Sequence, residues 1–180
     1  MTENIELNRA NAEQGVYDFL QSIGMHYDVL HHPAAFTMTE CEAVERQLGV
    51  PVCKNLFLCN RQQTDFYLLM IPADKPFKTK FLSSQLGCAR LSFASEENMQ
   101  QLLHISPGAV SPMGLIYDKD VKVRLIIDSE LQLAERFGCH PCVNTASLAL
   151  AMSDFIVQFL PAVNHTPTFV NLPRLAPEEM

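Results

Sequence analysis

The chain of 180 residues lacks the features that direct a protein into a membrane or a secretory route. No run approaches the ~20 consecutive apolar residues that a transmembrane helix needs. Its first residues, MTENIELNRANAEQG, are polar and acidic, whereas a signal peptide needs a basic start followed by an apolar stretch. We therefore expect a cytoplasmic protein that has no membrane partner.

Positive charge is also scarce. The chain has 13 lysine and arginine residues against 20 aspartate and glutamate residues, which gives a formal net charge of -7. This balance argues against the broad basic surface that nucleic-acid-binding proteins usually carry. Two local basic groups remain, formed by Lys75, Lys78 and Lys80 and by Lys119, Lys122 and Arg124. The simpler interpretation is a solvated face, and the alternative is local contact of the lysines near Lys78 with a few phosphates.

The composition is that of one packed domain. Hydrophobic residues make up 48% of the chain and charged residues 18%, and no internal repeat or low-complexity tract occurs. A chain of this length fits a single core. We expect one domain over residues 1–180, with its core at about 16–160 and an extended C-terminal tail at 161–180.

Apolar periodicity and capping signals predict a mixture of helices and strands. Val16, Phe19, Leu20 and Ile23 follow the i, i+3, i+4, i+7 spacing of one helix face, and T-x-x-E from Thr39 is a capping box. Helices are expected over residues 16–24, 39–49, 78–87, 95–104 and 153–160. Strands are expected over 27–32, 55–60, 65–72 and 121–128, with the second and third as a hairpin. Because regular βαβ spacing is absent, the fold class is α+β with a mixed sheet.

The segment FGCHPCVNTAS, residues 137–147, allows three interpretations. A redox C-x-x-C usually stands at a helix N-terminus, but the residues after Cys142 are small or β-branched and show no helical face. A structural zinc site needs a second pair of ligands at suitable spacing, and no other C-x-x-C occurs. The third interpretation is a loop whose backbone matters more than its thiols.

Such a loop has the residues of a binding turn. Gly138 allows close approach of the backbone, Pro141 stiffens the turn, and His140 and Asn144 offer hydrogen-bonding groups. Exposed N–H groups of a turn can hold a carbonyl oxygen or an oxyanion. Lys54 stands at the entry to an apolar strand, either with its charge reaching solvent or as a cation that meets a phosphate or a polarised carbonyl.

Three short segments, taken together, resemble a known family. CKNLFL, SPGAVSPMGL and GCHPCVNTASL occur in the order of the aminoacyl-tRNA deacylase family, which includes YbaK and the editing domain inserted in bacterial prolyl-tRNA synthetases. The resemblance covers about Val16 to Leu160 and is greatest for freestanding editing proteins that remove alanine mischarged onto tRNA(Pro). It implies a single compact α+β domain with a curved mixed sheet and surrounding helices.

The resemblance also implies the site. The lysine of the family's K-N-L-F motif falls on Lys54, and the glycine and histidine of its G-x-H-P loop fall on Gly138 and His140, so these three are the expected catalytic residues. The expected substrate-binding residues are Phe36, Thr37, Met38, Asn55, Ser111, Pro112, Cys139, Pro141 and Asn144. Cys142 departs from the family pattern, where we expect a plain apolar residue. No metal or other cofactor is expected.

The implied reaction is hydrolysis of an aminoacyl ester that is already reactive, so no serine or cysteine nucleophile is needed. Backbone N–H groups near Gly138 would hold the ester carbonyl, Lys54 would anchor the terminal phosphate or the ester, and the vicinal ribose hydroxyl would help to activate water. A synthetase pocket built for proline rejects alanine weakly, because one methylene is worth only about 1–3 kcal/mol. A second pocket, formed by Phe36–Met38 and Pro112, would admit alanine and exclude proline.

The expected partners are mischarged tRNA(Pro), mainly through its CCA end, and prolyl-tRNA synthetase. Removal of cysteine or serine is an alternative, since their side chains are close to alanine in volume. A noncatalytic module that docks on a tRNA or a synthetase is a second alternative, and a thiol oxidoreductase that uses Cys139 and Cys142 is a third. A Ser-His-Asp hydrolase is disfavoured because no G-x-S-x-G elbow occurs.

Overall fold

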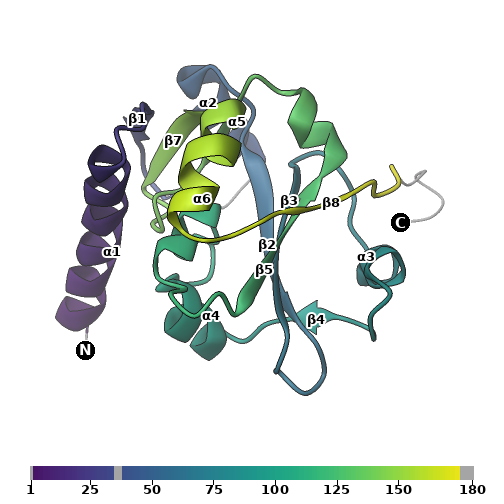
Figure 1. Ribbon diagram of the computed structural model, residues 1–180. Coiled ribbons are helices and arrows are strands. Elements are labelled where there is room, and N and C mark those ends of the chain that lie inside the picture. The colour runs from purple at the N-terminus through teal and green to yellow at the C-terminus, as the bar shows by residue number, and fades with distance from the viewer. Residues whose placement is uncertain (1, 35–37, 175–180) are drawn as a thin grey trace.

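Two β-sheets and the helices around them form the structure, a computed structural model that describes residues 2–34 and 38–174 (Figure 1). The helices are α1 (Thr2–Ser22), α2 (Met38–Leu48), α3 (Thr79–Leu86), α4 (Glu96–Leu103), α5 (Met152–Asp154) and α6 (Leu160–Ala162). The strands are β1 (Asp28–His31), β2 (Cys53–Cys59), β3 (Phe66–Pro72), β4 (Ser92–Phe93), β5 (Val123–Asp128), β6 (Arg136–Cys139), β7 (Ala146–Ala151) and β8 (Thr168–Val170). Short helical turns are η1 (Pro112–Ile116), η2 (Ser129–Leu133) and the π-helical η3 (Phe155–Phe159), which joins α5 to α6.

The larger sheet is mixed and has the order β4-β2-β3-β5-β8. β2 pairs with β3 and β4 in antiparallel fashion, whereas β3 with β5 and β5 with β8 are parallel. The smaller sheet, β1-β7-β6, is antiparallel. A single parallel bridge between Val52 and Gly138 joins the two sheets. The predicted α+β class with a mixed sheet is confirmed.

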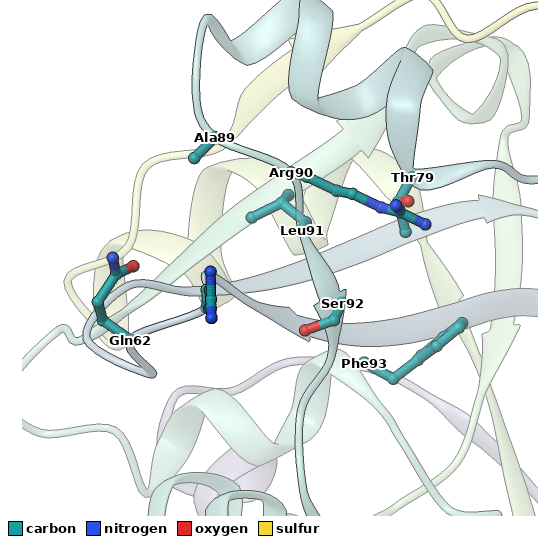
Figure 2. A pocket seen from close by; sticks show the side chains of 8 residues that line it. Gln62, Thr79, Ala89, Arg90, Leu91, Ser92 and Phe93 are labelled. Carbon is teal, nitrogen blue, oxygen red and sulfur yellow. The ribbon is translucent and has the colours of Figure 1, made fainter.

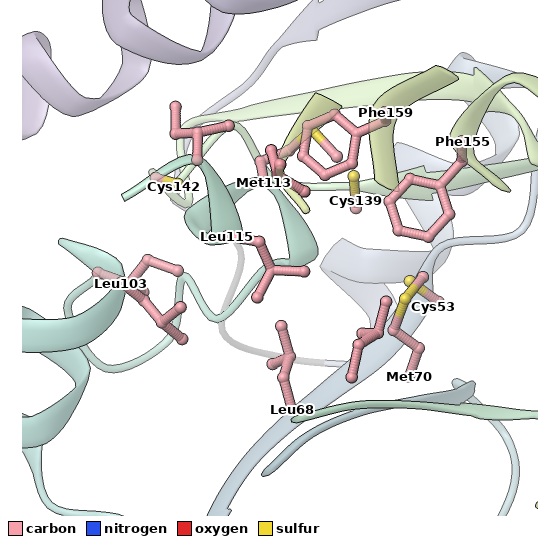
Figure 3. Close-up of a cluster of buried hydrophobic side chains, with 14 of the residues drawn as sticks. Cys53, Leu68, Met70, Leu103, Met113, Leu115, Cys139, Cys142, Phe155 and Phe159 are labelled. Carbon is pink, nitrogen blue, oxygen red and sulfur yellow. The ribbon is translucent and has the colours of Figure 1, made fainter. Parts of the chain in front are cut away.

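Both faces of the larger sheet are covered, which explains the continuous apolar run of β3. Leu68 and Met70 face the main core, to which α1, α4 and the 152–162 helical segment contribute. Figure 3 shows this core, with Phe155 and Phe159 close to Cys139. Leu69 and Ile71 face the other way, into a smaller cluster with α3. The fold therefore has a helical layer on each face of its central strands.

Several predicted elements lie where the sequence placed them. Gly87 ends α3 in the left-handed conformation, and Ser95 caps α4 by accepting a hydrogen bond from the amide of Asn98. β2 starts at Cys53, so Lys54 lies within the strand rather than before it. α1 extends back to Thr2, far before the predicted start at residue 16, and Ala12 continues the buried row of Val16 by one turn.

Two predictions of irregular structure need correction. Residues 137–147, interpreted as a loop, are irregular only over 140–145, because β6 ends at Cys139 and β7 begins at Ala146. The small and apolar residues of ASLALA pair with β1 and β6. The tail expected to lie extended over the surface instead adds β8 to the larger sheet. Val170 and Leu172 of this tail are buried. Within the described residues, no helix is long and apolar enough to cross a membrane.

The interpretation of Lys75 as part of a solvated basic face was also wrong. Its side chain has 0% exposure, and its Nζ lies 2.8 Å from Asp128 Oδ2 and 2.9 Å from Glu130 Oε1. Arg174 extends the network, because it pairs with both Glu130 and Asp74. A buried ammonium is expensive unless it is paired, and here two carboxylates provide that pairing.

Replacing Lys75 by methionine should therefore destabilise the fold by about 3–5 kcal/mol, because it leaves the buried Asp128 carboxylate without its cation. Urea unfolding measures the change. The matched control is Lys80→Met, since Lys80 is exposed and lies over the ring of Phe81. The control should change stability by less than about 1 kcal/mol. Equal losses in the two variants would contradict the role given to the buried pair.

Candidate functional site

A cavity of about 320 Å³ opens where β2 begins. Val52, Cys53, Lys54 and Asn55 form one wall, and His140 approaches from the other sheet. The remaining lining comes from α2 (Cys41, Glu42 and Glu45), from Ala73 after β3, and from Gly108 and Val110 before η1. The volume lies at the lower end of the range for small-molecule pockets.

The bridge between the two sheets brings Lys54 and His140 together. The amide of Gly138 donates to the carbonyl of Pro51 at 2.7 Å, and Val52 pairs with Gly138 in parallel. Lys54 lies two residues after Val52, and His140 lies two residues after Gly138. In parallel strands, residues that are equally far from a bridge remain opposite one another. The register therefore places the two predicted catalytic side chains at one cavity.

Gly138 joins the two sheets through its backbone. Its own N–H is bonded to Pro51 and is not free to hold a carbonyl oxygen. A Cβ at this position would lie 2.8 Å from Cγ2 and 3.2 Å from Cα of Val52. Glycine is required because the two backbones approach so closely. Gly138 thus joins the two sheets, and its own amide is not one of the free N–H groups expected near this residue.

Lys54 is half-buried and held by two backbone carbonyls. Its Nζ donates to the carbonyl of Lys75 at 2.6 Å and to that of Ala73 at 3.3 Å. An ammonium has three N–H donors, so one remains for a ligand. Burial lowers the pKa of Lys54, and the negative charge of Asp74 partly offsets that shift. The Lys75–Asp128 pair anchors the turn that supplies these carbonyls.

His140 is fixed from two sides. Its Nδ1 lies 2.9 Å from the carbonyl of Ala146, so Nδ1 carries the proton that it donates there. The hydroxyl of Ser111 donates to the backbone carbonyl of His140. Burial lowers the pKa of His140, and nearby His32 adds to this effect. The ring is therefore neutral at pH 7, with Nε2 as an acceptor.

The two thiols of C-H-P-C are core residues. Cys139 and Cys142 are buried among the apolar side chains of the main core (Figure 3). Burial raises the pKa of both thiols, and that of Cys139 lies well above its ordinary value. A redox dithiol needs a lowered pKa at its first thiol. The structure therefore gives no support to an oxidoreductase, and no cluster of metal-ligating side chains occurs among the described residues.

The other predicted substrate-binding residues divide into three groups. Asn55 lines the cavity. Ser111, Pro112, Cys139 and Pro141 are buried beside it, and Asn144 is half-buried in the same turn, but none of the five is part of the lining. Phe36 and Thr37 lie outside the described residues, and Met38 is the first residue of α2, with a side chain that is not described.

Two glutamates of α2, Glu42 and Glu45, form an acidic wall of the cavity that was not predicted from the sequence. Glu45 accepts a hydrogen bond from the amide of Val52 at 2.9 Å, which ties α2 to the start of β2, and Glu42 lies one turn earlier. Both glutamates belong to the helix predicted over residues 39–49, but their spacing did not show which face of that helix meets β2. Gly108 and Val110 lie within the quoted motif SPGAVSPMGL, although only Ser111 and Pro112 were selected from it.

Comparison with known proteins assigns the family. The profile of the aminoacyl-tRNA editing domain matches residues 32–156, which include both Lys54 and His140. The chain belongs to this family. It is 31% identical over 144 residues to the prolyl-tRNA editing protein ProX of Acetoanaerobium sticklandii, covering 80% of this chain and 88% of the relative. It is 30% identical over 167 residues to prolyl-tRNA synthetase associated domain-containing protein 1 of Mus musculus, covering 91% and 95%.

The fold agrees with this family. A crystal structure described as a candidate trans-editing enzyme for prolyl-tRNA synthetase superposes with a TM-score of 0.68. Sequence identity is 16%, and the match covers 90% of this chain and 98% of that one. At such low identity the likeness concerns the fold alone, and it extends to nearly the whole editing domain.

Substitution Gly138→Ala should destabilise this editing domain by about 1–3 kcal/mol, because the added methyl group meets Val52 where the sheets join. Urea unfolding of Gly138→Ala, Val52→Ala and the double variant forms a double-mutant cycle. Val52→Ala removes the atom at 2.8 Å, so the double variant should be more stable than the sum of the single losses predicts. Additive losses would show that Val52 does not require a glycine opposite it.

Proposed function

We propose that this chain is a trans-editing deacylase that hydrolyses alanine from mischarged tRNA(Pro). The observation that carries the proposal is the meeting of Lys54 and His140 at one cavity, in a member of the aminoacyl-tRNA editing family. The names of the relatives, prolyl-tRNA editing protein and prolyl-tRNA synthetase associated domain, support tRNA(Pro) as the carrier. Such a substrate places the reaction in the cytoplasm.

The cavity is suited to hydrolysis without a covalent intermediate. Two thiols line it, Cys41 and Cys53, and burial raises the pKa of both, that of Cys53 to about 12. Neither is a ready thiolate at pH 7. An aminoacyl ester is already activated, so water can attack it once the carbonyl is held and polarised. The vicinal ribose hydroxyl and the neutral Nε2 of His140 are the groups that orient this water.

We assign to the amide of His140 the oxyanion role expected of the N–H groups near Gly138. The amide of Gly138 points toward β2, because it bonds to Pro51. Amides along an extended strand alternate in direction, so the next amide directed to that side belongs to His140. Ser111 holds the carbonyl of the same residue and so fixes the orientation of this turn. A donor placed in this way is worth roughly 3 kcal/mol in an acyl-transfer transition state.

Opposite charges in the cavity match the two ends of the substrate. The third N–H of Lys54 is available to the ester carbonyl or to the phosphate of the terminal adenosine. Glu42 and Glu45 on the facing wall provide carboxylates for the α-ammonium group of the amino acid. This arrangement orients the ester between the lysine and the acidic wall. The partner is therefore the CCA end of the tRNA, and prolyl-tRNA synthetase supplies the mischarged molecule.

Size discrimination was expected of Phe36–Met38 and Pro112, and of these Phe36 and Thr37 lie outside the described residues. The cavity has room for an aminoacyl group together with part of an adenosine, so its volume of about 320 Å³ does not by itself separate alanine from proline. Residues 35–37 directly precede α2, whose Cys41 and Glu42 line the cavity. We assign the exclusion of proline to this segment. Hydrolysis of cysteinyl or seryl esters is the alternative specificity.

The Lys54→Ala variant should lose at least about 100-fold in kcat/KM for Ala-tRNA(Pro), because it removes the charge-bearing donor of the cavity. The measurement is release of labelled alanine from the mischarged tRNA. Lys119→Ala is the control, since Lys119 is exposed and is not part of the cavity lining, and it should keep the starting rate. Wild-type rate in Lys54→Ala would refute the assignment. No hydrolysis by the starting protein would favour a noncatalytic docking module.

A panel of Ala-, Cys-, Ser- and Pro-tRNA(Pro) should give hydrolysis of the alanyl ester and none of the prolyl ester. The reason is that a pocket selective by size accepts the smaller residue and excludes the pyrrolidine ring. Deacylation of each substrate is followed under single-turnover conditions. Equal rates for the alanyl and prolyl esters would contradict the size sieve, and a faster rate for cysteine or serine would reassign the substrate.

A further inference from the structure

A groove of about 790 Å³ lies at the other end of β2 from the candidate site (Figure 2). It is bounded by Arg61 and Gln62 in the β2–β3 turn, by Thr79 at the start of α3, and by residues 89–93, which lead into β4. In Figure 2 the side chain of Arg90 extends toward Thr79 across this groove. The proposed deacylation reaction uses none of these residues.

The charges of this groove are unusual for the molecule. Four arginines pair with carboxylates: Arg46 with Glu42, Arg124 with Asp65, Arg136 with Asp28, and Arg174 with Asp74 and Glu130. Among the arginine side chains that the structure describes, Arg61 and Arg90 are the two with no carboxylate in ion-pair range. Both line the groove, and its lining contains no acidic residue. A chain with net charge -7 thus keeps two uncompensated guanidinium groups in one place.

An exposed aromatic ring accompanies these cations. Phe93 is 62% exposed and lines the groove next to Ser92. Nucleic-acid-binding surfaces combine exposed aromatic rings with arginine. Guanidinium groups bind phosphate oxygens, hydroxyl groups such as those of Thr79 and Ser92 donate to them, and a ring stacks on an unpaired base.

The groove and the catalytic cavity lie along the same side of β2. At the start of β2, β6 adjoins this side through the Val52–Gly138 bridge. At the end of β2, β4 pairs with Leu58 and Cys59. Lys54 is near the first contact and Arg61 just beyond the second. At about 3.3 Å per strand residue the two sites are roughly 20 Å apart. This distance corresponds to about six stacked nucleotides.

We propose that this groove binds the phosphate backbone of the tRNA acceptor strand whose 3′ end occupies the Lys54 cavity. Arg61 and Arg90 neutralise phosphates, and Phe93 stacks on a base or a ribose. The inference rests on the proposed function for the identity of the RNA. It explains how an acidic chain gains affinity for a polyanion through one local site.

The test compares two substrates in the double variant Arg61→Ala/Arg90→Ala. For Ala-tRNA(Pro), kcat/KM should fall about tenfold or more, mainly through KM. For the minimal ester alanyl-adenosine, which is too short to reach the groove, it should stay within about twofold. The slope of log KM against log salt should become shallower by roughly one to two, because two phosphate contacts are lost. Equal losses for both substrates would overturn the proposal.

A second double variant, Arg124→Ala/Arg136→Ala, is the matched control. It removes the same charge from exposed arginines that pair with surface carboxylates elsewhere. If it weakens tRNA binding as much as the groove variant, the effect is one of net charge, and the groove has no specific role. The variant Phe93→Ala should raise KM for the tRNA and leave the salt slope unchanged, because stacking involves no counterion.

Direct binding separates failure of this proposal from failure of the proposed function. Fluorescence anisotropy with an uncharged acceptor-stem minihelix needs no hydrolysis. Weaker binding by Arg61→Ala/Arg90→Ala supports the groove even if the starting protein proves inactive on Ala-tRNA(Pro). Unchanged binding overturns the groove even if deacylation is observed. Displacement of the minihelix by a poly-glutamate peptide at much lower concentration than by unlabelled RNA would assign the groove to an acidic protein partner and overturn the RNA assignment.

Discussion

The candidate site depends on the close contact of two backbones at Val52 and Gly138. This contact is the bridge between the two sheets, with the amide of Gly138 bonded to Pro51 at 2.7 Å and no room for a Cβ. The parallel register then carries Lys54 and His140 to one cavity. Neither side chain needs a dedicated loop to position it, since each belongs to, or directly follows, a strand packed on the core. A site built in this way gains precision from the scaffold.

The second requirement is a buried lysine that contacts no substrate. Lys75 is neutralised by Asp128 and Glu130, and its own carbonyl receives the ammonium of Lys54. The fully buried Lys75 therefore fixes the backbone carbonyl that orients the half-buried ammonium of Lys54. The two lysines have different roles. Lys75 is buried and holds the turn through its ion pairs, whereas Lys54 keeps one N–H for a ligand. Burial at the same time lowers the pKa of Lys54.

Much of this arrangement could be predicted from the sequence, and the rest depends on tertiary contacts. The helix cap at Ser95, the turn at Gly87 and the β2–β3 hairpin follow from local signals that the fold did not override. The family motifs selected Lys54 and His140 as candidates, and both line one cavity. The β6–β7 hairpin was missed because the pairing of ASLALA with β1 is long-range. The burial of Lys75 and the role of the Gly138 amide were missed for the same reason, since Asp128 and Pro51 are distant in sequence.

The most direct test of this account is a crystal structure with the 3′-amide analogue of alanyl-adenosine, which replaces the ester by a bond that is not hydrolysed. The account predicts the analogue in the cavity at the start of β2, with its carbonyl oxygen within hydrogen-bond distance of the His140 amide and with Lys54 facing the same ligand. Binding elsewhere, or in this cavity with the carbonyl turned away from both groups, would contradict the claim that the sheet junction creates the active site.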